Sequence, residues 1–174
     1  MAKRRRIPSW VVLLAFAVFV GGAIGLLAYA RARRVRDTTR YCLARTPSSA
    51  VVRERASIPL VEHGSKRGAA FCELHFRPRA DAPSALVVIS RKGTHWNTRV
   101  MEVAGPTQRQ PGFFEKPGVR GAYVDLLDGD QVSRYVVIFP GRDGDEALEL
   151  QVDPKVFELE EAVEIAADIA ARLR

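Results

Sequence analysis

The chain lacks the short motifs that carry common enzyme chemistry. Its 174 residues contain no P-loop, no G-x-G-x-x-G and no G-x-S-x-G nucleophile elbow. His63 and His95 are expected in or beside turns, and neither has an acid at the spacing of a catalytic triad. We therefore predict that the protein has no catalytic residues and is not an enzyme.

Metal-binding patterns are also missing. Cys72 and His75 form a C-x-x-H pattern, which is half of a zinc site. In a strand, however, residues i and i+3 point to opposite faces, so this pair cannot bind one ion. The Asp-Gly-Asp sequence at 128–130 lacks the twelve-residue spacing and closing glutamate of a calcium loop, and turn chemistry explains it. We predict no metal site and no cofactor.

Cysteine is scarce, because the chain contains only Cys42 and Cys72. Two separate buried thiols and a disulfide between them both stay open, the disulfide requiring an oxidising compartment. A disulfide would pack the first helical segment of the domain against the Cys72 face of the sheet. Closing this loop would add roughly 3–4 kcal/mol on the chain-entropy model.

Acidic residues are nearly absent from the first forty positions, where Asp37 is the only one. The net charge is +8 over residues 1–40, +6 over 41–110 and −7 over 111–174. No basic helix carries interleaved aromatic residues, so we predict no nucleic-acid binding. The basic clusters flank an apolar segment and indicate contact with anionic lipid: Lys3, Arg4, Arg5, Arg6, Arg31, Arg33, Arg34 and Arg36.

The apolar segment is an uncharged run from Ile7 to Ala30. As a helix rising about 1.5 Å per residue it would span the ~30 Å core of a bilayer. We predict a single-pass transmembrane anchor at 7–30, after a basic tail at 1–6 and before a basic juxtamembrane linker at 31–40. A cleaved signal peptide is the alternative, because Ala28-Tyr29-Ala30 fits A-x-A, but the apolar run is longer than such peptides have.

The orientation of this anchor follows less directly, because both flanks are basic. A short tetrabasic tail is difficult to translocate, which places the N-terminus in the cytoplasm and the domain on the extracytoplasmic, periplasmic side. Gly21 and Gly25 have the spacing of a helix-pairing motif, so a homodimer through the anchor is open.

Residues 41–174 are expected to form one soluble α+β domain with an antiparallel sheet of five to six strands. Residues 41–104 would supply helix and three strands, and residues 113–174 three strands and a C-terminal helix. Helices are expected at 38–45, 50–56 and 158–173, and strands at 70–77, 85–91, 94–103, 119–127, 131–139 and 147–152. Phe113 and Phe114 would pack on the core from a long loop at 105–118.

The order of elements in residues 7–104 resembles a small family of membrane-anchored cytochrome oxidase assembly factors. That family is related to a subunit domain of the mitochondrial presequence translocase. The matching segments are the anchor, the helical Tyr41-Cys42-Leu43-Ala44, a second helical turn at 50–56, Ile58-Pro59 and three strands at 68–76, 85–89 and 93–100. Trp96, after the Lys92-Gly93 turn, is the most specific point. The resemblance implies a helper of membrane-complex assembly or translocation, without catalysis and outside the cytoplasm.

We predict a membrane-anchored, non-catalytic module for protein interaction or membrane-complex assembly, with the lipid bilayer and other membrane proteins as partners. The alternative is a membrane-tethered domain that binds a small ligand or lipid between the sheet and the C-terminal helix. A cavity lined by Phe113, Phe114, Tyr123 and Tyr135 would favour ligand binding. A filled core with an exposed apolar patch would favour the interaction module.

Overall fold

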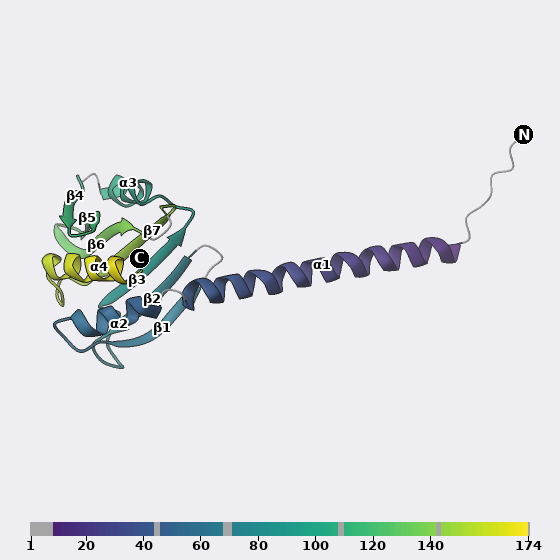
Figure 1. The fold of residues 1–174 in the computed structure, drawn as a ribbon, viewed down its shortest axis with the longest axis horizontal. Helices are drawn as coiled ribbons and strands as arrows, with labels where there is room; N and C mark the ends of the chain where they lie inside the picture. Colours follow the sequence, from purple (N-terminus) through teal and green to yellow (C-terminus); the bar gives the residue numbers. More distant parts are fainter. Residues whose placement is uncertain (1–8, 44–45, 68–70, 108–109, 142–143, 174) are drawn as a thin grey trace, which may run out of the picture. The chain divides into compact units, whose positions relative to one another are not determined.

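A computed structural model describes residues 9–43, 46–67, 71–107, 110–141 and 144–173 (Figure 1). The chain divides into two compact units, residues 1–37 and residues 38–174. Helix α1 (Ser9–Leu43) forms the described part of the first unit and ends within the second. The described part of the chain contains four helices and one seven-stranded antiparallel sheet.

The first unit does not support the predicted membrane anchor. Among the residues that the structure describes, no helix is both long and apolar enough to cross a membrane. The transmembrane anchor at 7–30, the single-pass signal-anchor assignment and the extracytoplasmic placement are therefore corrected.

The basic residues beside the predicted anchor have separate outcomes. Lys3, Arg4, Arg5 and Arg6 lie outside the described residues. Residues 31–40 are helical rather than a linker, since α1 runs through Arg34 to Leu43, and it exposes the side chains of Arg31, Arg33 and Arg36. The short helix expected from residue 38 is thus the end of α1. Pairing of two copies through Gly21 and Gly25 stays a prediction.

The sheet has the strand order β1-β2-β3-β7-β6-β5-β4, and every neighbouring pair is antiparallel. Its seven strands correct the expected number of five to six. The strands are β1 (Val61–Arg67), β2 (Phe71–Arg77), β3 (Leu86–Lys92), β4 (Gly112–Lys116), β5 (Val119–Asp128), β6 (Gln131–Pro140) and β7 (Glu146–Val152). Five of them, β2, β3, β5, β6 and β7, confirm strands predicted from alternating or continuous apolar runs.

The strand predicted at 94–103 is wrong, because this segment lies in helix α3 (Trp96–Thr107). Its valines and tryptophan suggested a strand, but Trp96, Val100 and Val103 also have the i, i+4, i+7 spacing of one helix face, and they pack together. His95 caps the helix: its Nδ1 accepts the N–H of Asn97 at 3.3 Å.

Two strands were not predicted. β1 is polar and contains Gly64, so it lacks an apolar pattern. β4 lies where a long loop was expected, and the two-residue turn Pro117-Gly118 joins it to β5 with Lys116 opposite Val119. Gly118 has φ 80°, which suits glycine in such a turn. Phe114 packs on the core as expected, whereas Phe113 is exposed.

Helices cover the two faces of the sheet unequally. Helices α2 (Thr46–Arg55) and α4 (Leu159–Leu173) pack together on one face, over the main core. Helix α3 covers part of the other face, over β5, β6 and β7, at the end of the sheet where β4 lies (Figure 1). The part of this face formed by β1 and β2 carries polar side chains, such as Glu73 and His75.

A disulfide joins Cys42, at the end of α1, to Cys72 in β2. Their Cα atoms are 5.5 Å apart, and both residues are buried in the main core. Of the two alternatives that the sequence left open, the structure contains the disulfide. It ties the last turn of α1 to the Cys72 face of the sheet.

We expect the double substitution Cys42→Ser/Cys72→Ser to lower the free energy of unfolding of the full chain by roughly 3–4 kcal/mol. The disulfide closes a sequence separation of 30 residues, and its loss releases chain entropy in the unfolded state. Chemical denaturation followed by circular dichroism measures the change, and wild type under a reductant is the control. Equal stability of the oxidised wild type and the double variant would contradict this prediction.

Candidate interaction site

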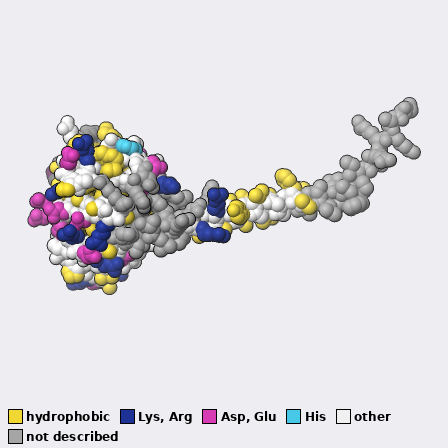
Figure 2. Space-filling view, viewed as in Figure 1, with side chains coloured by type: hydrophobic (Ala, Val, Ile, Leu, Met, Phe, Trp, Pro, Cys, Tyr) yellow, Lys and Arg dark blue, Asp and Glu magenta, His cyan; other side chains and the backbone are white. Residues whose placement is uncertain are grey.

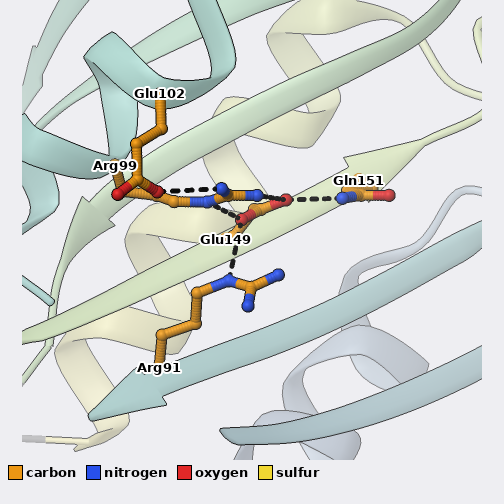
Figure 3. A network of polar contacts seen from close by, with 5 residues as sticks. All are labelled: Arg91, Arg99, Glu102, Glu149 and Gln151. Carbon is orange, nitrogen blue, oxygen red and sulfur yellow. Dashed lines mark hydrogen bonds and ion pairs between the residues drawn. The ribbon is translucent and has the colours of Figure 1, made fainter. Parts of the chain in front are cut away.

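A buried carboxylate holds α3 on the sheet (Figure 3). Glu149, in β7, is fully buried. Arg99 of α3 donates to both of its oxygens, from Nε to Oε2 at 2.8 Å and from Nη2 to Oε1 at 3.4 Å. Gln151 Nε2 donates to Oε1 at 2.5 Å. Arg91 Nε, from β3, lies 3.6 Å from Oε2, which is an ion pair rather than a hydrogen bond.

This pairing satisfies a charge that would otherwise be costly to bury. Burial opposes the charge on Arg99, but its contacts with Glu149 and Glu102 outweigh burial and raise the pKa of the guanidinium. Arg99 Nη1 donates to Glu102 Oε2 at 3.1 Å within the same helix. Arg99 is thus oriented by its own helix and by β7, so α3 has a defined position on the sheet.

We expect Arg99→Met to reduce the free energy of unfolding by about 3 kcal/mol, because it leaves the Glu149 carboxylate buried with weaker partners. Arg99→Met/Glu149→Leu should recover most of this loss, since it removes both charges. Arg79→Met is the matched control: Arg79 pairs with Asp81 at 3.9 Å on the surface and should change stability by less than about 1 kcal/mol. Urea unfolding measures all three, and a loss no larger than that of the control would refute the role of Glu149.

The outer edge of β4 and the start of α3 form an open hollow. Within the described residues, β4 pairs only with β5, so its other edge carries backbone groups without a neighbouring strand. Phe113 of β4 is 66% exposed. The hollow has a volume of about 500 Å³ and is lined by Trp96, Asn97, Phe113, Phe114, Glu115 and Arg120. Figure 2 shows hydrophobic side chains among charged ones near the position of α3.

The two edges of the sheet differ in how well they resist pairing with another strand. β1 contains a bulge between Glu62 and Gly64, and its Lys66 side chain is 72% exposed. Bulges and edge lysines both discourage strand addition. β4 runs in regular register with β5 and exposes Phe113. The β4 edge is therefore the better acceptor for an added strand.

The cavity that would have favoured a small ligand is not formed by the expected aromatic residues. Tyr123 and Tyr135 pack against the main core and do not line the hollow. Phe114 packs on the core and also borders the hollow, and Phe113 is exposed there. Gly112 makes room for the Tyr123 ring, and Gly121 makes room for the Phe114 ring. A Cβ on Gly121 would lie 2.5 Å from the Phe114 ring and 2.7 Å from the Ile138 carbonyl oxygen. Ring and glycine face each other across β4 and β5, and the space between them is filled.

Gly121→Ala should therefore destabilise the domain by about 2 kcal/mol, because the carbonyl oxygen of β6 cannot move away as a side-chain end can. Gly64→Ala serves as the strand control, since a Cβ there would meet nothing within 4 Å. Thermal or urea unfolding of the two variants compares them directly. Equal stability would show that β4 and β5 are not packed this closely.

The remaining predicted site residues lie apart from the hollow. Cys72 is buried on one face of β2 and His75 lies on the other, as the alternation predicted. Asp128 and Asp130 flank Gly129 at the β5–β6 turn, where Gly129 has φ 62°. Among the described residues, no group of three or more His, Cys, Asp or Glu side chains is placed to hold a metal ion.

Sequence reasoning missed the hollow because its lining comes from α3, β4 and β5, of which α3 and β4 were assigned to other structures. The Pro117-Gly118 pair was the available signal, since Pro-Gly marks a tight turn between two strands. Contacts among Glu73, His75 and Ser84, and between Ser84 and His63, were also missed. These residues come from neighbouring strands and the segment between them, so local spacing could not reveal them.

Comparison with known proteins gives no match: no family model fits the chain, and no curated protein and no solved structure is detectably similar to it. The resemblance to the membrane-anchored assembly factors stays a prediction. One of its segments changes, because Trp96 opens helix α3 rather than a third strand.

Proposed function

We propose that the protein is a non-catalytic interaction module that binds an extended polypeptide segment along the free edge of β4. The observation that carries this proposal is Phe113, an apolar side chain 66% exposed on an edge strand beside an open hollow. Exposed apolar groups gathered beside unpaired strand backbone are typical of binding by strand addition.

The backbone of β4 supplies the general part of the binding. In an antiparallel ladder, alternate residues of an edge strand direct their N–H and C=O groups away from the sheet. A partner strand can pair with these groups whatever its sequence. Because β4 has five residues, the ladder is short, and side-chain contacts must add to the affinity.

The hollow supplies the selective part. One apolar side chain of the partner would enter between Trp96 and Phe113. Trp96 is held in place because its helix is anchored through Arg99 to Glu149, and such preorganisation lowers the cost of binding.

Charge defines a second contact of the partner. Arg120 lines the hollow and pairs with Glu115 at 3.5 Å. The Arg120 side chain is 68% exposed and the Glu115 side chain is 73% exposed. Exposed ion pairs are weak, so Arg120 can exchange Glu115 for a carboxylate of the partner. The preferred partner is thus a strand with an apolar residue and an acid on the same side, two positions apart. In an assembly role, this segment would belong to another protein of the complex.

A displayed library of random peptides tests the proposal. Peptides selected on the wild-type chain should carry the apolar and acidic residues at that spacing. They should bind Phe113→Asp at least about 10-fold more weakly, because a charge in the hollow removes the apolar contact. Val61→Asp is the matched control, since Val61 is 59% exposed on the opposite edge strand, and it should leave binding unchanged. Fluorescence anisotropy measures the affinities.

Amide hydrogen exchange locates the bound peptide. Protection should increase in β4 and not in β1. Peptides that lose affinity with Val61→Asp and not with Phe113→Asp would overturn the proposal. So would a selection without binders, or self-association of the wild-type chain that Phe113→Asp abolishes, because the edge would then belong to a second copy.

A further inference from the structure

The bulge in β1 turns an extra residue toward the neighbouring strand. The register pairs Glu62 with Phe76 and Gly64 with His75, which leaves His63 between them without an opposite residue. A bulge changes the direction of a side chain, and bulges are common next to functional sites. Here it brings the His63 ring to 5.8 Å from the His75 ring, measured between centroids.

The two imidazoles converge on one point. His63 Nε2 lies 2.8 Å from the hydroxyl oxygen of Ser84, and His75 Nδ1 lies 3.4 Å from the same oxygen. Ser84 belongs to the segment between β2 and β3. Two ring nitrogens from different strands therefore face one small volume, which a hydroxyl group now occupies.

The Glu73 carboxylate orients the His75 ring through its other nitrogen. His75 Nε2, the nitrogen that faces away from Ser84, lies 3.2 Å from Glu73 Oε2. A histidine that binds a metal typically donates its other ring N–H to a carboxylate, which sets the tautomer and increases the basicity of the ligating nitrogen. Glu73, His75 and the point of convergence have this arrangement.

We propose that His63 and His75 form a binding site for a divalent transition-metal ion such as Zn²⁺ or Cu²⁺. His63 Nε2 and His75 Nδ1 are the protein ligands, Glu73 positions His75, and water fills the remaining coordination positions. The metal displaces the hydrogen bonds to Ser84, and rotation of the exposed His63 side chain brings its nitrogen to the ~2.0–2.1 Å that zinc requires.

The ligands, rather than the charges around the site, select the kind of ion. Lys66, whose Nζ is 3.9 Å from Glu73 Oε2, lies in β1 opposite Glu73, and Arg77 follows His75 on the same face of β2. These cations repel all divalent ions alike, so selection among them comes from the ligands. Imidazole ligands favour Zn²⁺ and Cu²⁺ over Mg²⁺ and Ca²⁺, which prefer oxygen.

Titration of the tag-free full chain with Zn²⁺ alone in a calorimeter tests the proposal, together with electron paramagnetic resonance of added Cu²⁺. We expect one equivalent of metal and nitrogen hyperfine coupling to Cu²⁺. His63→Ala and His75→Ala should each lower the metal affinity by at least about 10-fold. Glu73→Gln should lower it by about 10-fold, as expected for a residue that hydrogen-bonds to a metal ligand.

His95→Ala is the matched control, because His95 is the third histidine of the chain and caps α3 instead. It should bind metal like the wild type, and so should Phe113→Asp, since the hollow is formed by other residues. Circular dichroism of each variant confirms that it is folded. Absence of Zn²⁺ and Cu²⁺ binding by the wild type, or equal binding by His63→Ala, would overturn the proposal, as would equally tight Mg²⁺ binding.

Discussion

The position of α3 depends on one buried charge. Glu149 lies in the middle of β7 with no exposed surface, and Arg99 reaches it from a segment fifty residues earlier. A carboxylate in that place requires cationic partners. Arg91 forms only an ion pair with it, whereas Arg99 donates two hydrogen bonds, so the helix that carries Arg99 packs over β7, β6 and β5. The hollow beside β4 follows from this, because Trp96 opens the same helix. Val100 and Val103 of this helix add apolar contacts with the sheet.

The two faces of the sheet have different roles. The face under α2 and α4 is a filled core, closed further by the Cys42–Cys72 disulfide and by aromatic rings over glycines. Phe114 and Tyr123 pack against this core. The other face is only partly covered, and both candidate sites are on it, one at the β4 edge and one on β1 and β2. Binding is therefore expected at the margins of the sheet.

Much of the fold could be predicted from periodicity, and the failures have physical causes. β2 alternates between buried and half-buried residues, and α4 repeats its apolar residues at helical spacing, so local pattern and tertiary environment agree. In α3 they conflict: valine and tryptophan favour a strand, and the pairing of Arg99 with Glu149 favours the helix. The polar β1 is stabilised by pairing with β2, and no pattern within its own sequence predicts that pairing. The anchor was predicted from its uncharged apolar run and its basic flanks, but no helix in the described part of the chain is both long and apolar enough to cross a membrane.

By itself, the sequence determined the elements whose side chains repeat at one period, the turn at Gly129, and the separation of Cys72 from His75 on opposite faces of β2. These are properties of the backbone and of residues a few positions apart. Only the tertiary structure decided which distant side chains meet: Arg99 with Glu149, Cys42 with Cys72, and His63 with His75 and Ser84. The physical reason is that these contacts depend on strand order and on a one-residue bulge, and both are set by packing of the whole sheet.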